Sequence, residues 1–330
     1  MEPRTLTLLL NDRCPLRCAH CSAGFSAQDR GSNQVMDKET MRRILMSLDP
    51  KRYQMVVLAG GEPALVPDLV SAAVDACREA GIWSALSTGP YWANTLATAR
   101  RFLASISQPD FLILSFDKYH LDFISIDHYI NAVTAALELN IHAAVNICYT
   151  SAEERETTYK KTLPFRDKLT GIHFARVMPL KNATHLDSTL AEGVTLDKIE
   201  DLKMVPRSCK IGNGQLKRDF EFHACCWSGQ IPSSPLMFSR NAARHPGEIG
   251  SMDESRIFRR IHGTGIIDVL SNKGQAKLLK LFHGRRFVNE CHLCITMLQE
   301  RVWLDWMELE PYAEPLEGMP AGVAHEVETR

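Results

Sequence analysis

The feature of the sequence that most restricts its fold is a regular alternation of two hydrophobic patterns over about the first 180 residues. Short apolar runs typical of buried strands alternate with longer segments whose apolar residues recur at helical spacing. The predicted strands cover residues 5–11, 54–63, 83–90, 110–120, 142–149 and 171–180. The predicted helices cover residues 36–48, 66–82, 93–106, 127–140 and part of 151–169. Such alternation predicts an α/β fold with a parallel sheet, either doubly wound or closed into a complete or partial barrel.

Glycines and polar residues stand where the predicted strands end. In both parallel architectures the carboxyl ends of the strands meet at one rim, and ligands bind there. The residues at these positions are Asn11, Gly60, Gly61, Glu62, Ser87, Thr88, Gly89, Ser115, Asp117, Asn146, Arg176 and Met178. We therefore expect a binding site on this rim.

Three cysteines, Cys14, Cys18 and Cys21, follow the first predicted strand in the stretch CPLRCAHC. Thiolate ligands favour zinc or an iron–sulfur cluster. Three thiolates can hold three irons of a [4Fe–4S] cluster and leave the fourth iron open. Structural zinc needs four ligands, and His20 is the alternative fourth ligand, although its place beside Cys21 makes joint chelation awkward.

The cysteine spacing and the stretch AGGEP together resemble the radical SAM superfamily. The family has Cys-x3-Cys-x2-Cys after the first barrel strand, and the three cysteines of CPLRCAHC fit this pattern. Its Gly-Gly-Glu motif is matched by Gly60, Gly61 and Glu62. The resemblance covers about residues 5–190 and implies a partial (β/α)6 TIM barrel.

This resemblance also implies two cofactors, a [4Fe–4S] cluster and S-adenosylmethionine. The open iron would be chelated by the amino and carboxylate groups of S-adenosylmethionine, and the Gly-Gly-Glu motif would receive the amino group. Reductive cleavage would then give a 5′-deoxyadenosyl radical that abstracts hydrogen from the substrate. His20 stands where the family usually has an aromatic residue, so its ring is expected near the cofactor. Further contacts to the ribose, carboxylate or adenine are expected from Ser87, Ser115, Asp117, Asn146 and Met178, with capping or packing as the alternative for each.

After about residue 190 the alternation stops and a second set of cysteines follows. A Gly-Asn-Gly turn predicts a small hairpin within residues 208–232, and a Cys-x-x-Cys begins a predicted helix near residue 291. The four thiolates suit either zinc or a closed [4Fe–4S] cluster, and they belong to Cys209, Cys225, Cys291 and Cys294. Behind a radical SAM core, this spacing resembles the twitch domain, a shortened SPASM domain with one auxiliary [4Fe–4S] cluster.

The predicted organisation therefore has three parts. Residues 1–190 form the barrel, and residues 191–310 form a small α+β domain for the auxiliary cluster. Residues 311–330 are rich in Pro, Gly and Glu and are expected to form a flexible tail.

Cys226 directly follows Cys225, and adjacent residues of a strand face opposite sides. If Cys225 binds the auxiliary cluster, Cys226 points away from it, towards the barrel mouth; the sequence leaves open which of the two is the ligand. An inert buried thiol is the alternative for Cys226. With CPLRCAHC, AGGEP and SFDKYH, the paired cysteines resemble radical SAM peptide epimerases of the epipeptide type, which convert L-residues of ribosomal peptides to D-residues. The resemblance implies that Cys226 is the hydrogen-atom donor.

Other functions fit the same residues. An epimerase or dehydrogenase of a sugar or aminocyclitol would use similar chemistry. An enzyme that cross-links a peptide through a thioether or a C–C bond would not need Cys226 as a donor. Outside catalysis, a zinc-binding interaction protein is the remaining alternative.

The composition of the chain restricts the classes of partner that the protein is expected to bind. A formal net charge of -1 provides no field for nucleic acid or an anionic membrane, and no apolar run approaches the roughly 20 residues of a membrane span. Ten cysteines without a secretion signal indicate a cytoplasmic protein. No leader-binding module precedes the first strand, so a precursor peptide or small-molecule substrate would be held by the barrel mouth and the second domain. A reducing partner such as flavodoxin or ferredoxin would supply electrons.

Overall fold

The structure is a computed structural model. It describes residues 4–24, 35–186, 192–207, 213–225, 237–239, 241–244, 246, 249 and 265–300. Cys209, Cys226 and the predicted tail lie outside these residues. Among the helices of the described part, none is both long and apolar enough to cross a membrane.

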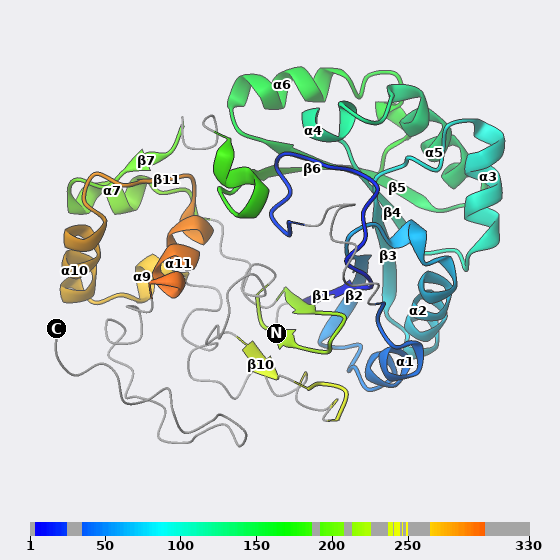
Figure 1. Cartoon of the computed structure of the whole chain (residues 1–330), viewed down its shortest axis with the longest axis horizontal. Helices are drawn as coiled ribbons and strands as arrows, with labels where there is room; N and C mark the ends of the chain where they lie inside the picture. The colour runs from blue at the N-terminus through cyan, green and yellow to red at the C-terminus, as the bar shows by residue number, and fades with distance from the viewer. Residues whose placement is uncertain are drawn as a thin grey trace.

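One large sheet organises the N-terminal part of the chain (Figure 1). Six of its strands run parallel and neighbour one another in sequence order. They are β1 (Arg4–Leu9), β2 (Tyr53–Ala59), β3 (Trp83–Thr88), β4 (Phe111–Ser115), β5 (His142–Tyr149) and β6 (Gly171–Arg176). The predicted parallel α/β sheet is confirmed, with every predicted strand present.

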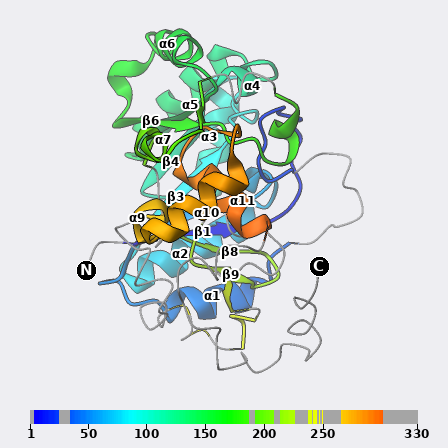
Figure 2. The ribbon, with the colours of Figure 1, turned by 90° about the vertical axis from the view of Figure 1, so that its left-hand side faces the viewer.

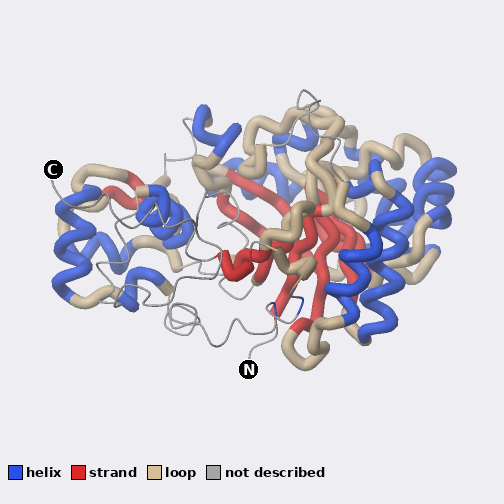
Figure 3. The backbone as a smooth tube through the Cα atoms, turned by 60° about the horizontal axis from the view of Figure 1, so that its bottom comes forward, coloured by secondary structure: helices blue, strands red, loops and turns tan. Residues whose placement is uncertain are grey.

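Helices connect successive strands and cover the outer face of the sheet (Figures 1 and 3). The α-helices of this part are α1 (Lys38–Met46), α2 (Pro67–Ala80), α3 (Leu96–Ser105), α4 (Lys118–Leu121), α5 (Ile126–Glu138) and α6 (Ala152–Lys160). Short 3-10 helices are η1 (Pro63–Leu65), η2 (Arg166–Lys168) and η3 (Lys181–His185). Local sequence sets these bounds: Asp37 accepts a hydrogen bond from Thr40 N at the start of α1, and Gly81 ends α2 with a φ of 71°.

The two faces of the sheet differ in how they are covered. The outer face packs against the helices through fully buried side chains such as Leu8, Leu58 and Leu114. Inner-face residues such as Val57 and Ser87 keep partial exposure although they lie in the middle of the sheet. In a closed TIM barrel the interior is filled by side chains of its own strands. The inner face of this sheet therefore leaves room for a ligand.

The C-terminal part extends the same sheet. Strand β8 (Gly214–Leu216) pairs parallel with β1, β9 (Phe222–His223) pairs antiparallel with β8, and β10 (Met237–Ser239) follows. The predicted hairpin is present, but its turn is not the Gly-Asn-Gly stretch. Gly214 begins β8, where a Cβ would meet the Phe222 ring at 2.8 Å. The chain instead reverses at residues 217–221, where Lys217 N donates to Glu221 O at 2.9 Å.

The remaining described elements form a separate unit on the side of the sheet opposite α2 and α3 (Figures 1 and 2). They are β7 (Val194–Thr195), α7 (Ile199–Met204), α9 (Ile266–Val269), α10 (Asn272–Phe282), β11 (Arg286–Phe287) and α11 (Glu290–Gln299). β7 and β11 pair antiparallel and join the two chain segments of this unit.

Candidate active site

The cysteine loop is held at the carboxyl end of β1 by the turn that follows β2. Gly61 N donates to Asn11 O at 2.7 Å, Glu62 N donates to Arg13 O at 2.7 Å, and Asn11 Nδ2 donates to Glu62 O at 3.0 Å. A Cβ at Gly61 would lie 2.2 Å from Arg13 O. A Cβ at Gly60, where φ is +143°, would lie 2.6 Å from Asn11 O. Both glycines are therefore needed for the two backbones to approach this closely.

The Glu62 carboxylate ties this turn to the end of β3. It accepts hydrogen bonds from Thr88 Oγ1 at 2.6 Å, Gly89 N at 2.9 Å and Ala64 N at 2.9 Å, and the residue is only 2% exposed. Burial raises the pKa of Glu62 to about 7, and the three hydrogen bonds oppose this rise. Thr88 makes this contact and Ser87 does not, since adjacent strand residues face opposite sides.

The three loop cysteines are thiols without a disulfide, and Cys18 is the most buried of them. Cys21 N donates to Cys18 O at 3.1 Å, which curls the end of the loop. Burial raises the pKa of Cys14 to about 12, so this thiol keeps its proton until a metal displaces it. Three thiols on one loop at the strand rim are a donor set that fits an iron–sulfur cluster.

His20 contacts Asp117 and Tyr119. Its Nε2 lies 3.4 Å from Asp117 Oδ2, and its ring stacks on Tyr119 at 4.6 Å. Two groups of described residues have all their ligand atoms within 4.8 Å of one another: Cys18 with His20 and His120, and His20 with Asp117 and Cys148. Neither group includes Cys14 or Cys21, so His20 and the three loop thiols do not form a group with all ligand atoms within 4.8 Å of one another.

Asp117 is the centre of a buried ionic network. Both of its carboxylate oxygens lie 2.9 Å from His120 Nδ1, and Oδ1 also accepts from His120 N at 3.0 Å. Burial alone would lower the pKa of His120, but the charge and hydrogen bond of Asp117 raise it well above its ordinary value. Burial alone would raise the pKa of Asp117, but His120 holds it below its ordinary value. The pair is therefore a buried carboxylate with an imidazolium beside the cysteine loop.

The His20 ring nitrogen Nδ1 is buried without a hydrogen-bond partner among the described residues. Burial lowers the pKa of His20, so the ring is neutral. An unpaired polar atom is costly in a folded protein unless a ligand or water satisfies it. This orphaned nitrogen beside Cys21 therefore fits a bound cofactor.

The structure brings three of the other predicted contacts to one face. Ser115 pairs with Asn146 on the neighbouring strand, and Ser87 pairs with Ile113 two residues below Ser115. All three therefore face the inner side, near the carboxyl ends of their strands. Met178 follows β6 and is 2% exposed.

The sequence places Thr88 on the predicted rim but not among the expected cofactor contacts, and it selects neither Tyr119 nor His120 as a site residue. The available signal for His120 was its place three residues after Asp117, because an aspartate that caps a helical turn meets the third residue of that turn.

The structure describes three of the four thiols predicted for an auxiliary cluster. Cys291 and Cys294 lie near the start of α11, three residues apart, and Asn289 caps this helix by accepting from His292 N at 2.9 Å. Cys225 follows shortly after β9. Their joint binding of a cluster stays a prediction, because Cys209 lies outside the described residues.

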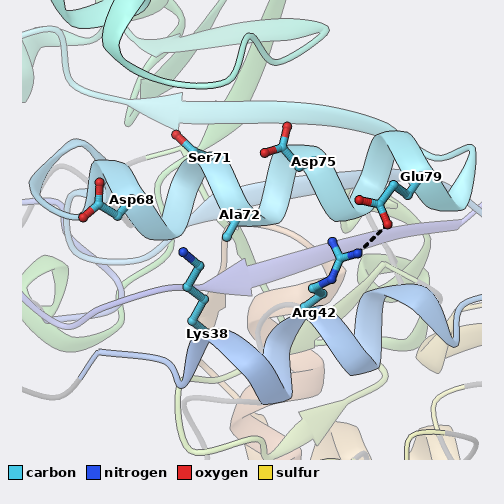
Figure 4. Close-up of a pocket in the computed structure, with 7 residues that line it drawn as sticks. All are labelled: Lys38, Arg42, Asp68, Ser71, Ala72, Asp75 and Glu79. Atoms are coloured by element: carbon cyan, nitrogen blue, oxygen red, sulfur yellow. Dashed lines mark hydrogen bonds and ion pairs between the residues drawn. The ribbon is translucent and has the colours of Figure 1, made fainter.

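A surface groove between α1 and α2 contains none of the predicted site residues (Figure 4). It is lined by Lys38, Arg42, Asp68, Ser71, Ala72, Asp75 and Glu79. Arg42 Nη2 and Glu79 Oε2 pair across it at 2.5 Å. It belongs to the packing of two outer helices.

Comparisons with known proteins agree with this geometry. Residues 8–160 match the family described as the Radical SAM superfamily. A solved structure described as histidine-tagged anSMEcpe with bound AdoMet has a TM-score of 0.54 and 14% identity, covering 92% of this chain and 93% of that chain. At this identity the likeness concerns the fold.

Two curated relatives are PqqA peptide cyclases. Those of Methylorubrum extorquens (strain PA1) and Methylobacterium sp. (strain 4-46) are 36% and 35% identical to this chain over 86 residues. The matched stretch is 26% of this chain and spans only 22% of the length of those relatives.

The sheet and the rim loop define a partial α/β barrel whose loop carries three thiols, a donor set that suits a metal cluster. The match shows that residues 8–160 form a Radical SAM domain. A domain of this family implies one [4Fe–4S] cluster and S-adenosylmethionine as cofactors, and the loop thiols and the orphaned His20 nitrogen fit them.

Proposed function

We propose that this protein is a radical SAM enzyme that epimerises residues of a ribosomally made peptide. The main support for a radical SAM enzyme is that the cysteine loop is hydrogen-bonded to the Gly60-Gly61-Glu62 turn. A peptide substrate is supported by the curated relatives, whose name states that they act on the PqqA peptide. The epimerase subtype is supported by the paired Cys225 and Cys226 in the sequence.

In this proposal Cys14, Cys18 and Cys21 hold the first cluster. When bound, this cluster and S-adenosylmethionine would allow a hydrogen atom to be abstracted from the substrate. Glu62, fixed by Thr88 and Gly89, keeps the turn against the loop. The inner-face residues Ser87, Ser115 and Asn146, together with Met178, His20 and Asp117, are proposed to line the cofactor.

Inversion of a carbon centre then needs a hydrogen delivered from the other face. Cys226 is proposed to donate it, since a thiol S–H bond is weak. The resulting thiyl must regain one electron and one proton to restore the thiol. Cys209, Cys225, Cys291 and Cys294 would hold an auxiliary [4Fe–4S] cluster, which would supply electron transfer to this site. A reducing partner such as flavodoxin or ferredoxin would be the source of the electron.

The test uses heavy water and a variant of the proposed donor. Reduced wild-type protein, S-adenosylmethionine and synthetic peptides covering the short reading frames beside the gene are incubated in D2O. We expect a single deuterium per inverted residue, because the thiol hydrogen exchanges with solvent. Cys226→Ala should still form 5′-deoxyadenosine but give no inverted peptide. Cys77→Ala, which removes a buried thiol of α2, is the matched control and should invert normally. Inversion by Cys226→Ala at the wild-type rate would refute the donor role.

Peptide cross-linking is the second candidate, because the curated relatives are named as cyclases. Cross-linking removes two hydrogens from the peptide and would proceed without Cys226. A product lighter by two hydrogens, without deuterium, therefore favours this candidate. If metabolites are converted and peptides are not, an epimerase or dehydrogenase of a sugar or aminocyclitol takes its place.

A further inference from the structure

One row of laterally paired residues across the sheet contains two polar side chains, Gln215 and His223, that are not part of the candidate active site described above. Thr7 of β1 pairs with Gln215 of β8, and Gln215 pairs with His223 of β9. In the other direction, Thr7 pairs with Val57, and the row continues through β3 to Phe111 of β4. Paired residues of a sheet share a face, so Gln215 and His223 lie on the inner face with this row.

Both side chains are buried, and their polar atoms lack the hydrogen bonds that would offset the loss of contact with water. Gln215 is 6% exposed and His223 is 2% exposed. Gln215 Oε1 and both ring nitrogens of His223 have no hydrogen-bond partner within the described part of the chain. Glu221 Oε2 is 3.6 Å from His223 Nε2, which is too far for a hydrogen bond, and Glu221 pairs with Lys217 at 2.6 Å. Buried polar groups without partners are rare in folded proteins, so two adjacent ones call for an explanation, such as a binding partner that is absent from the structure.

This row lies closer to the amino ends of the strands than the residues that are predicted to bind the cofactor. Phe111 precedes Ser115 by four residues on β4, which is about 13 Å along a strand. Ala59, Ser87 and Ile113 lie between these levels and are only partly buried. A substrate between the cofactor and the hairpin would therefore lie next to the row that contains Gln215 and His223.

We propose that Gln215 and His223 hydrogen-bond the main chain of the peptide substrate. A peptide group offers one N–H donor and one C=O acceptor. Gln215 Oε1 accepts from the N–H of the peptide, and the ring N–H of His223 donates to its carbonyl. The hairpin thus holds the peptide through its backbone, independently of the side chain at the modified position. This inference rests on the proposed function, in which the substrate is a peptide.

The test compares binding with stability in the full, cluster-loaded chain. Gln215→Leu and His223→Phe remove the hydrogen-bonding groups and keep side chains of similar size. With the synthetic peptides described above, each variant should raise KM about tenfold, the usual effect of losing a hydrogen bond from a buried site, while kcat is largely retained. Tm should stay level or rise, because these groups have no partner to lose. His223→Gln keeps an N–H donor and should recover much of the affinity.

Gln275→Leu is the matched control. Gln275 Nε2 on α10 donates to Ile267 O and Leu270 O, both at 3.4 Å. This variant should lower Tm and leave KM unchanged, the opposite pattern.

Three outcomes contradict the proposal. If the wild type converts a peptide and KM is unchanged in both variants, the pair has no binding role, while the proposed function stands. If Tm and iron content fall together in the variants, the pair is structural or ligates metal. If the wild type forms 5′-deoxyadenosine but neither binds nor converts any peptide, the peptide substrate fails, and the role of the pair fails with it.

Discussion

At the scale of single residues, two acidic side chains at the rim already have hydrogen-bond partners within the protein, although the sequence suggests that they bind a cofactor. The sequence places Asp117 at a strand end and predicts a cofactor contact. In the structure its carboxylate is engaged by His120 and faces His20. Glu62 is likewise occupied by Thr88, Gly89 and its own turn. Both acids therefore set the shape of the rim, and their direct contact with a cofactor remains a prediction.

The two glycines of the rim turn give a prediction at this scale. Gly61→Ala would place a Cβ 2.2 Å from Arg13 O, which belongs to the backbone of the cysteine loop. We expect this overpacking to cost about 1–3 kcal/mol and to displace the loop. Gly171→Ala is the control, because its Cβ would meet nothing within 4 Å. Thermal unfolding and iron content after reconstitution measure the difference. Equal iron content in the two variants would show that the turn does not position the loop.

The sequence predicts residues that lie close together along the chain better than their partners in space. The loop cysteines and Gly60-Gly61-Glu62 are evident because each motif is contiguous. The link between them is made by backbone groups of Asn11 and Arg13, which leave no mark in the sequence. The stacking of Tyr119 on His20 depends on how α4 packs, so it could not be predicted either.

At the scale of elements, the hairpin β8–β9 is the feature that the sequence predicts least well. Two short runs with a turn were expected, but not their pairing with the edge of β1. A short strand contains no information about its partner, because pairing depends on tertiary packing and burial. The six-strand core, in contrast, follows from alternation, because parallel neighbours must be joined by crossover helices.

The hairpin tip also contacts the cysteine loop, since Arg218 Nε pairs with Asp12 Oδ2. Arg218→Ala should remove this support at a cost of about 1 kcal/mol or less, because the pair is only partly buried. We expect a chelator to strip iron from the loop faster in this variant. Arg100→Ala removes an exposed ion pair with Glu138 on the outer helices and is the control. Identical stripping rates in Arg218→Ala and Arg100→Ala would exclude a role of the hairpin in holding the loop.

At the scale of the whole molecule, the cysteine loop and Cys225 lie at different levels of the sheet. Cys14 follows β1 and stands at its carboxyl end. β9 runs antiparallel to β8, which is parallel to β1, so Cys225 lies beyond the level of Thr7 towards the amino end of β1. The open inner face lies between these levels. A substrate bound there would have the cysteine loop on one side and Cys225 on the other, which suits the proposed removal of hydrogen from one face of a carbon and its return from the opposite face.

This separation predicts that the two sets of thiols bind metal independently. Replacing Cys14, Cys18 and Cys21 with Ala should lower the iron content from about eight to about four per chain, since each [4Fe–4S] cluster has its own thiolates. The variant should form no 5′-deoxyadenosine. Cys291→Ala with Cys294→Ala should remove the other half of the iron and lower Tm, because metal binding stabilises a small unit. Iron analysis, 5′-deoxyadenosine assays and thermal unfolding measure these effects. Zinc in place of the remaining iron, or loss of all metal from the triple variant, would contradict independent clusters.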